Sequence, residues 1–547
     1  MKTFNNIIIS AVTVMILWSC QEGLLEKYPI NTINPSTFWM DESEAEMAVN
    51  DLYRYLPDIN QIMMDRKSDI AVQSVGATNF LIIGAVDNSH AEFQTWWASN
   101  YNAVSAVNRF LKGIELVPEN KISQEKYNRM IAEARVIRAI AYTFLVNYFG
   151  NVPFFTHVIE VSEALTISRT DKQTVLDFIE TELAEAAEIL PVKYSGGDIG
   201  RITKGAALAW KARAMLWCGR FDKAATAAKA VVDLGAYGLE PNYARLFQYD
   251  GEYNNEEVIL ERIYTMQHRH NLTARVAPYE FTGQSATMEI NATKALVDAY
   301  ETVNGLSIND DPTYDPEDPY RNLEPRYYAT IWSPVYREGA YADTLWGKTA
   351  PHDCRPGALN ENGQLSKDIL ESTQNSNVTG FLFKKYTNRE DLADVTACHQ
   401  NYIILRYADV LLMYAEAQNE HSGPDASVYK AVNDVRSRAG LPELPAGLSK
   451  EEMRAKIRHE RMIELAMEGL RFYDIRRWNI VKQVMPDGQA VAQMHYYDIA
   501  TGEKKMPVWT RCIYNVPVNA DNTFSVPFRE YNMNPNLLPN NPGWNND

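Results

Sequence analysis

The sequence predicts a mostly α-helical protein in which pairs of helices support an irregular, loop-rich region. Two blocks with helical periodicity, at about 20–235 and about 401–547, flank a stretch of different composition at about 236–400. The middle stretch is rich in Tyr, Pro, Asn, Asp and Gly and contains only short helical or strand-like runs. We expect the three parts to pack as one unit, with the loops laid over a helical scaffold, where binding residues usually lie.

The chain opens with a secretory leader. Lys2 supplies a positive charge, residues 7–17 form a short apolar run, and Ser19 precedes Cys20. The run is too short to cross a bilayer as a stable helix, so residues 1–19 are predicted to be a signal peptide. A cysteine directly after a small residue resembles a bacterial lipobox, in which the thiol receives a diacylglycerol. We therefore expect the mature protein to begin at a lipidated Cys20 and to be anchored by its acyl chains.

Capping boxes mark the starts of three predicted helices, because a polar side chain at the helix start and one three residues later can satisfy each other's backbone N–H groups. The pairs are Asp41 with Glu44 for 41–56, Thr170 with Gln173 for 171–190, and Ser449 with Glu452 for 450–468. In the first helix, Met47, Leu52 and Leu56 are expected on the buried face. A fourth helix, 124–149, is predicted to end at Gly150.

Residues 204–235 form the clearest repeat unit. An apolar face runs along the first helix, Gly219 permits a tight turn, and an alanine-rich second helix allows the two to approach closely. The face consists of Ala207, Leu208, Ala212, Met215 and Leu216. The unit resembles a tetratricopeptide repeat, and residues 405–440 have the pattern of a second copy. Stacking such pairs buries a core that one pair could not bury alone.

Charged side chains on otherwise apolar helices predict an internal network of ion pairs, since isolated buried charges would be unfavourable. They are Arg406, Asp409, Glu416, Arg436, Arg438, Glu460, Arg461, Glu464, Arg471, Asp474 and Arg477. We therefore assign these residues to the scaffold and not to catalysis.

Composition excludes several classes of protein. The formal net charge of −17 argues against a nucleic-acid partner, which requires a basic patch. No segment after the leader has the roughly 18 apolar residues that a spanning helix needs, so the lipid is the only membrane attachment that the sequence indicates. The remaining cysteines are widely spaced and contain no CxxC, which indicates neither zinc nor a dense disulfide framework. A bridge between Cys354 and Cys398 stays open.

No catalytic or metal motif stands out. The sequence lacks the short motifs of serine hydrolases, zinc proteases, phosphate-binding loops and dinucleotide-binding folds. A pair of glycosidase carboxylates is recognised by a separation of about 5–10 Å, which a sequence does not give. His268, His270 and His352 are interpreted as loop histidines in preference to metal ligands. No cofactor is predicted, and calcium is kept as an alternative, because acidic turns offer oxygen ligands. The acidic residues are Asp310, Asp311, Asp315 and Asp318.

Aromatic residues give the better indication of function. A sugar presents an apolar C–H face and a rim of hydroxyl groups, so its binding site needs flat rings beside hydrogen-bonding side chains. In 79–102, Trp96 and Asn100 share a helix face, whereas Trp97 and Tyr101 are expected to point into the core. A second set lies in 327–347. Its members are Trp332, Tyr336, Tyr341 and Trp346.

Eight sequence motifs, in order along the chain, carry a resemblance to a known family. They are Phe38-Trp39 and the segments 132–154, 201–224, 318–331, 401–417, 432–442, 457–478 and 526–544. The sequence resembles the SusD/RagB family of outer-membrane lipoproteins from the lipobox to the C-terminus. Two departures are Glu324, where the family more often has Asp, and Val526-Pro527-Phe528, where Pro-Ile-Pro is usual.

The resemblance implies a binding protein that breaks no bond. Members of the family sit on a SusC-like TonB-dependent transporter at the cell surface and capture nutrients, usually glycans, at sites that draw on aromatic residues from the two regions above. We expect this chain to bind an oligosaccharide or polysaccharide and to deliver it to such a transporter. The alternatives are a peptide or other non-glycan nutrient, a glycoside hydrolase on a helical scaffold, and a lid without a ligand site. The sequence does not specify which glycan.

The lipid anchor can be tested directly. Cys20→Ala removes the thiol that would receive diacylglycerol, so the variant should fold but leave the membrane fraction or accumulate uncleaved. Metabolic labelling with radioactive palmitate measures the modification. Label that persists in the variant would contradict lipidation at Cys20.

Overall fold

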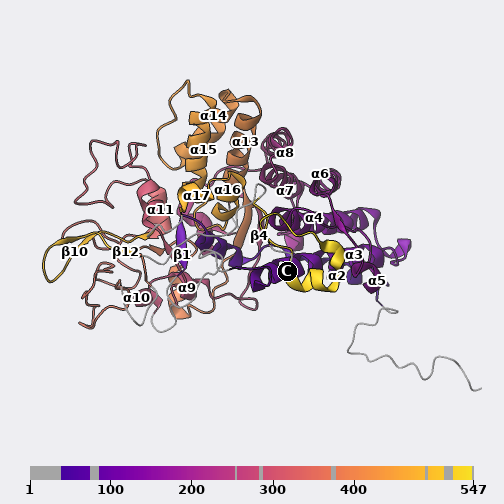
Figure 1. Cartoon of the computed structure of the whole chain (residues 1–547), viewed down its shortest axis with the longest axis horizontal. Helices are drawn as coiled ribbons and strands as arrows, with labels where there is room; N and C mark the ends of the chain where they lie inside the picture. The colour runs from indigo at the N-terminus through magenta and orange to yellow at the C-terminus, as the bar shows by residue number, and fades with distance from the viewer. Residues whose placement is uncertain are drawn as a thin grey trace, which may run out of the picture.

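The computed structural model describes residues 38–73, 86–252, 255–282, 287–370, 377–486, 491–509 and 522–544. The predicted leader and Cys20 lie outside these ranges. The described chain is mostly helical, with short strands and long loops between two groups of helices, which confirms the predicted fold class (Figure 1).

The long helices form one continuous stack, although the middle of the chain separates them in sequence. Neighbours pack in the order α3, α4, α6, α7, α8 and α13, and α13 also packs on α14 and α15. The first group is α2 (Glu42–Leu52), α3 (Ala91–Ile114), α4 (Gln124–Phe149), α5 (Val161–Ala164), α6 (Lys172–Ile189), α7 (Lys204–Trp217) and α8 (Phe221–Asp233). The second group is α13 (Tyr407–Ser422), α14 (Ala426–Arg438), α15 (Lys450–Glu464), α16 (Arg471–Arg477), α17 (Val481–Val484) and α18 (Phe528–Met533).

Short elements build the region between the two groups. Its helices are α9 (Leu272–Val276), α10 (Tyr279–Thr282), α11 (Lys294–Ala299) and α12 (Pro325–Thr330). A four-stranded sheet has the order β1 (Ala71–Gln73), β5 (Ile290–Ala292), β7 (Leu382–Phe383), β6 (Ile331–Trp332). Antiparallel pairs join β4 (Val258–Arg262) to β8 (Tyr402–Arg406), β2 (Val152–Pro153) to β3 (Arg169–Thr170), β9 (Val491–Ala492) to β12 (Val508–Trp509), and β10 (Tyr496–Tyr497) to β11 (Lys504–Lys505).

The helix starts agree in part with the predicted caps. Ser449 and Glu452 form the predicted capping box. Asp41 caps α2 by accepting the N–H groups of Ser43 and Glu44, but the carboxylate of Glu44 accepts the N–H of Met40 and not that of Asp41. Helix α6 is capped by Asp171 and not by Thr170, because the Asp171 carboxylate accepts the N–H of Gln173. Met47 is 56% exposed, so its predicted burial was wrong. The buried stripe of the first helix is instead Ala45, Val49, Leu52 and Leu56.

The two predicted repeat units are real helix pairs, and they lie beside each other. Helices α7 and α8 form one pair and α13 and α14 the other, with α8 packed on α13. Gly219 has φ +75° and ends α7 in a Schellman turn. The N–H of Arg220 donates to the carbonyl of Met215 at 2.9 Å, and the N–H of Gly219 donates to that of Leu216 at 3.1 Å.

A buried network of ion pairs joins the loop-rich region to the helices. Arg406 of β8 pairs with Glu464 of α15 at 2.6 Å and with Glu257 at 2.7 Å. Arg326 of α12 pairs with the same Glu464 at 2.9 Å and with Glu324 at 2.6 Å. Arg438 also pairs with Glu464. All these side chains are at most 3% exposed.

A second network fastens the C-terminal helices to each other. Arg461 of α15 pairs with Asp409 of α13 and Asp474 of α16, both at 3.0 Å. Arg477 forks onto Glu416 of α13, with one N–O distance of 2.7 Å, and pairs with Asp474 at 2.8 Å. Since Arg436, Glu460 and Arg471 are also buried in ion pairs, the predicted internal network is confirmed.

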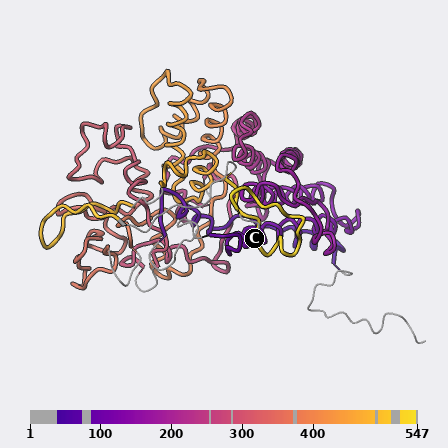
Figure 2. The backbone as a smooth tube through the Cα atoms, in the orientation of Figure 1, coloured from indigo at the N-terminus to yellow at the C-terminus, as the bar shows by residue number. Residues whose placement is uncertain are grey.

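The C-terminal segment returns to the first group of helices, where it contacts α3 and α5 (Figures 1 and 2). The N–H of Phe524 donates to the carbonyl of Tyr148 at 2.7 Å, and the amide of Asn541 donates to that of Phe149 at 2.9 Å. The two ends of the described chain are therefore packed into one body.

No disulfide forms among the described cysteines. Cys354 and Cys398 are buried free thiols, so the bridge that the sequence left open is absent between them. Cys218 is a free, partly buried thiol, and Cys512 lies outside the described residues.

A β-branched residue at position 219 should destabilise the protein by backbone strain alone. Nothing lies within 4 Å of an added Cβ there, so Gly219→Val should lose about 1–2 kcal/mol through its left-handed φ. Gly197→Val is the matched control, because that site is equally open and its φ is not positive. Equal denaturant midpoints for the two variants would contradict the turn assignment.

Removing the fork of Arg477 should be more damaging. Arg477→Ala strips Glu416 of two hydrogen bonds in a site where both side chains are at most 6% exposed, so we expect a loss of about 3–5 kcal/mol. Arg454→Ala breaks a similar but more exposed pair with Glu420 and should cost about 1 kcal/mol or less. Chemical denaturation measures both, and similar losses would contradict the burial argument.

Candidate functional site

An open groove of about 350 Å³ lies within the loop-rich region. Four segments line it: the single-turn helix Tyr243–Phe247 with the residue after it, helix α12, the loop that carries Trp346, and the chain that follows β7. The lining residues are Ala244, Phe247, Gln248, Pro325, Tyr328, Ala329, Trp346, Lys384, Lys385, Tyr386 and Thr387. Rings and polar groups alternate along it, and none of these described lining residues is acidic.

Two partly buried rings, Tyr328 and Trp346, line the groove. Trp346 is held in place by two neighbours, since it packs edge-to-face with Trp332 at 5.1 Å and with Phe281 at 5.6 Å between centroids. Tyr328 is fixed through its hydroxyl, which donates to the carbonyl of Tyr320 at 2.8 Å. Tyr341 packs edge-to-face on Tyr328 at 5.3 Å and extends the aromatic surface beyond the groove.

The polar groups of the groove differ in how they are engaged. Lys385 is buried, and its ammonium donates to Tyr243, to the carbonyl of Ala466 and to Glu468 at 2.7–2.8 Å. Burial lowers the pKa of Lys385 to about 8 although Glu468 opposes that shift. By contrast, the amide of Gln248 and the ammonium of Lys384 make no hydrogen bond to any described residue and remain available to a ligand.

Two of the residues predicted to bind ligand are part of the packing. Trp332 is 1% and Tyr336 2% exposed, so neither presents a ring face to solvent, and their ligand role stays an untested prediction. Trp332 belongs to a small apolar cluster with Phe281, Leu345 and Leu382. Tyr336 packs against Tyr320 and Tyr497.

Trp96 and Asn100 lie away from the groove, on α3. Trp96 stacks on Tyr148 at 4.5 Å between centroids and contacts Phe524 at 5.3 Å, so it joins the packing between α3, α4 and the C-terminal segment. The amide of Asn100 donates to the carbonyl of Trp96 at 2.7 Å. Trp97 is buried and the Tyr101 hydroxyl donates to the carbonyl of Pro153, as expected of core residues. A ligand role for Trp96 and Asn100 stays a prediction.

The sequence reasoning missed three residues of the groove. Tyr328 lies in 327–347, the second aromatic stretch of the sequence analysis, but nothing in the sequence distinguishes it from the buried Tyr327 beside it. Gln248 and Lys384 come from segments far apart in the chain, which meet only through the fold. No sequence signal would have found them.

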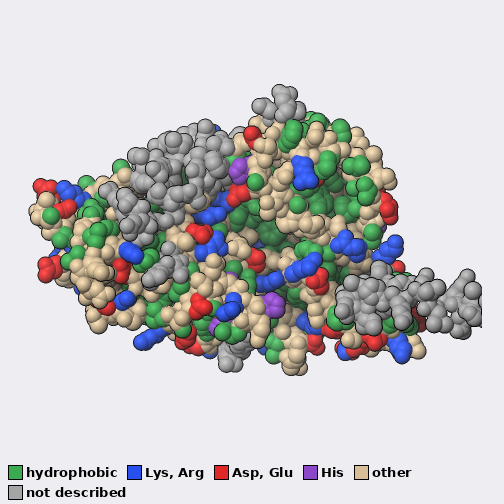
Figure 3. All heavy atoms as spheres, turned by 90° about the horizontal axis from the view of Figure 1, so that it is seen from below, with side chains coloured by type: hydrophobic (Ala, Val, Ile, Leu, Met, Phe, Trp, Pro, Cys, Tyr) green, Lys and Arg blue, Asp and Glu red, His purple; other side chains and the backbone are tan. Residues whose placement is uncertain are grey.

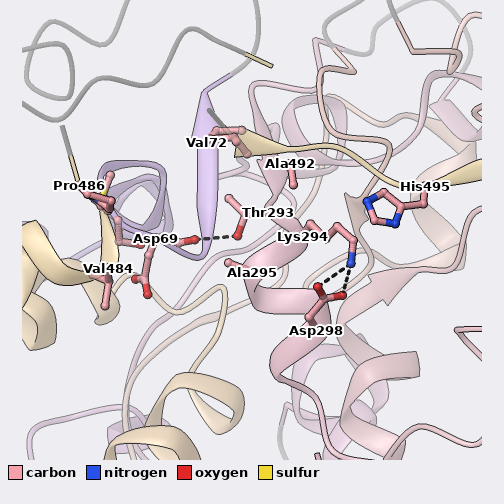
Figure 4. Close-up of a pocket in the computed structure, with 13 residues that line it drawn as sticks. Asp69, Val72, Thr293, Lys294, Ala295, Asp298, Val484, Pro486, Ala492 and His495 are labelled. Carbon is pink, nitrogen blue, oxygen red and sulfur yellow. Dashed lines mark hydrogen bonds and ion pairs between the residues drawn. The ribbon is translucent and has the colours of Figure 1, made fainter. Parts of the chain in front are cut away.

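A second cavity, of about 420 Å³, lies between β1, α11 and α17 (Figure 4). Its charged groups are already paired: Lys294 with Asp298 at 2.5 Å, and Asp69 with Arg471 at 2.7 Å. Thr293 donates to the carbonyl of Asp69. His495 is the one aromatic side chain among its described lining residues, and burial lowers the pKa of His495. This cavity offers fewer contacts to a sugar than the groove does.

A third depression, of about 440 Å³, lies near α2 and β4. Its arginines are engaged, since Arg201 pairs with Glu133 at 3.1 Å and Arg262 donates to the carbonyl of Tyr53. Glu261 is close to Glu252, and burial together with that neighbour raises the pKa of Glu261 to about 8. We therefore prefer the groove as the candidate site.

The side chains considered as metal ligands or reactive thiols form contacts with other residues of the protein. Across the described ranges, no three His, Cys, Asp or Glu side chains gather as a metal site. Asp311 accepts hydrogen bonds from Thr302, Thr313 and Asn304, which lower its pKa, and calcium there stays an untested prediction. The Sγ of Cys354 lies 3.2 Å from Nε2 of His352, but both are buried, and burial lowers the pKa of His352 to about 3. This pair is structural.

Positive and negative side chains are interspersed over the face seen in Figure 3. None of the helices in the described part of the chain is both long and apolar enough to span a membrane.

The described chain is thus a helical stack that carries a loop-built groove lined by aromatic and polar side chains. The SusD family profile matches residues 256–544, more than half of the chain, so this chain belongs to the SusD family. A second profile, described as starch-binding associating with outer membrane, matches residues 31–216. The predicted family is confirmed.

Similar proteins cover nearly the whole chain. SusD-like protein P25 of Formosa agariphila is 25% identical over 88% of this chain and 91% of its own length. SusD-like protein P2 of the same organism is 24% identical over 97% of this chain and 98% of its own length. The crystal structure of a SusD-like carbohydrate-binding protein from Bacteroides fragilis has a TM-score of 0.77 and 29% identity, covering 92% of this chain and 100% of that one.

Proposed function

We propose that this protein captures an oligosaccharide in the groove lined by Tyr328 and Trp346. The observation that carries the proposal is the combination of ring side chains fixed by their neighbours with polar groups that have no partner among the described residues. A sugar ring needs both, because its C–H face packs on aromatic rings and its hydroxyls form hydrogen bonds. The carbohydrate-binding relative from Bacteroides fragilis supports the same class of ligand.

Binding without hydrolysis fits this groove better than catalysis. A glycosidase needs two carboxyl groups on either side of the scissile bond. The described lining residues include no Asp or Glu, and the nearby Asp343 is held by the hydroxyl of Tyr341 at 3.0 Å and the N–H of Ser333 at 2.9 Å. We therefore propose that the protein holds its ligand intact.

Delivery to a transporter completes the proposal. The lipobox at Cys20 supports anchoring in the outer membrane, and the description of the second family profile supports that location. We propose that the anchored protein faces the exterior and hands its glycan to a SusC-like TonB-dependent transporter. A peptide ligand is the alternative that the binding test must include.

Truncation of Trp346 tests the groove. Trp346→Ala removes a stacking surface, so glycan affinity should fall about tenfold or more. Its melting temperature should fall as well, because the ring packs on Trp332 and Phe281. Trp96→Ala is the matched control, because it removes a ring that also packs on two neighbours, Tyr148 and Phe524, and should lower the melting temperature while leaving affinity unchanged.

The measurement is calorimetry or affinity electrophoresis against a panel of polysaccharides and peptides. Binding of peptides alone would overturn the glycan assignment. Release of reducing ends by the purified protein would overturn the claim that no bond is broken. Loss of affinity in Trp96→Ala, with Trp346→Ala unaffected, would move the site to α3.

A further inference from the structure

Lys384 is the one lining residue of the groove whose charge lacks a close partner among the described residues. Its side chain is 21% exposed, and the nearest carboxylate oxygen, on Asp343, lies 4.0 Å from Nζ, beyond hydrogen-bond distance. The ammonium sits over the ring of Trp332, with Nζ 4.6 Å from the centroid. A ring face holds a cation in place but accepts none of its three N–H donors as an oxygen would.

The neighbours of Lys384 do not supply the missing acceptor. Both oxygens of Asp343 accept hydrogen bonds, from Tyr341 and from the N–H of Ser333, and neither lies within hydrogen-bond distance of Nζ. Lys385, the next residue, also lines the groove, but it donates to Tyr243, Ala466 and Glu468. Lys384 is therefore a partly buried cation of the groove that donates no hydrogen bond from its ammonium to a described residue.

We propose that the groove selects an anionic oligosaccharide, whose carboxylate or sulfate pairs with Lys384 while a sugar ring packs on Trp346. This inference rests on the function proposed above and specifies the ligand of the same site. Trp332 contacts both residues, packing edge-to-face on Trp346 and lying under the Lys384 ammonium, so the ring and the charge are a fixed distance apart. A glycan that carries an anionic group next to a sugar ring fits this spacing between Trp346 and the ammonium of Lys384.

The physical reason for an anion is the state of the ammonium. A neutral hydroxyl can accept one of its hydrogen bonds, but an anion adds the attraction between opposite charges, which also offsets the unfavourable partial burial of the cation. Burial lowers the pKa of Lys384, and the charge of Asp343 only partly opposes that shift. A bound anion would replace the hydrogen bonds and the stabilisation of charge that the ammonium loses when it is removed from water.

The test compares matched glycans by calorimetry. The probes are an oligouronate, a sulfated oligosaccharide, and the carboxyl-reduced and desulfated forms of the same chains. Wild-type protein should bind one anionic form about tenfold or more tighter than its neutral counterpart, and that preference should shrink at high salt. The arm that shows the preference identifies carboxylate or sulfate as the source of the charge.

Variants of Lys384 and Lys430 distinguish the effect of the positive charge in the groove from the effect of the protein's overall charge. Lys384→Met keeps the length of the side chain over Trp332, and it should reduce binding of the anionic glycan to the level of the neutral one. Lys384→Arg should keep the preference. Lys430→Met removes the same charge from a side chain that is 73% exposed on α14 and should change nothing.

The outcomes distinguish the two proposals. Equal affinity of wild-type protein for charged and neutral forms, or unchanged anion binding in Lys384→Met, overturns the anionic ligand but leaves glycan capture standing. Absence of binding to every glycan overturns both. An unchanged melting temperature in Lys384→Met shows that any loss of affinity comes from the lost charge.

Discussion

The carboxylate of Glu464, buried among three arginines, is the interaction on which the rest of the structure depends. Burial alone would raise the pKa of Glu464, but Arg438, Arg406 and Arg326 outweigh it and hold that pKa well below its usual range. The three arginines come from α14, β8 and α12. One carboxylate therefore joins the helical stack, the strand pair β4–β8 and the loop-rich region. None of the partners can move away without leaving a buried charge unpaired, which is strongly unfavourable.

Three of the four segments that line the groove are fastened to this same point, the end of α15 and the residues just after it. Helix α12 is held through Arg326, next to Pro325. The hydroxyl of Tyr243 donates to the carbonyl of Glu464 at 2.9 Å, and Lys385 donates to the carbonyl of Ala466 and to Glu468. A groove made of loops is thereby as fixed as the helices behind it. A preformed site loses less entropy on binding, which favours capture of a flexible, well-hydrated ligand.

The parts of this arrangement that depend on local pattern could be predicted from the sequence, and those that depend on long-range packing could not. Charges such as Arg406 and Glu464 on apolar helices have to be paired, and Gly219 marks a turn whichever helices it joins. The exposure of an aromatic residue has no such local signature. Trp96 lies on a helix face that its own sequence leaves open, and it is covered by Tyr148 and by Phe524, over 400 residues away. Trp332 and Trp346 belong to the same predicted set of aromatic residues, yet Trp332 is buried and only Trp346 lines the groove.

The difference between these two tryptophans follows from strand pairing. Trp332 ends β6 and pairs with Leu382 of β7. The chain that leaves β7 runs beside Thr330, where the N–H of Lys384 donates to the Thr330 carbonyl at 2.8 Å and the Lys384 ammonium lies over the ring of Trp332. Trp346 lies in a loop outside the sheet, where it packs on Trp332 and Phe281 and contributes to the groove. The register of two residues of β-sheet thus decides which ring is buried and which is available. It also decides where a positive charge stands beside the available ring, and that spacing is what a ligand has to match.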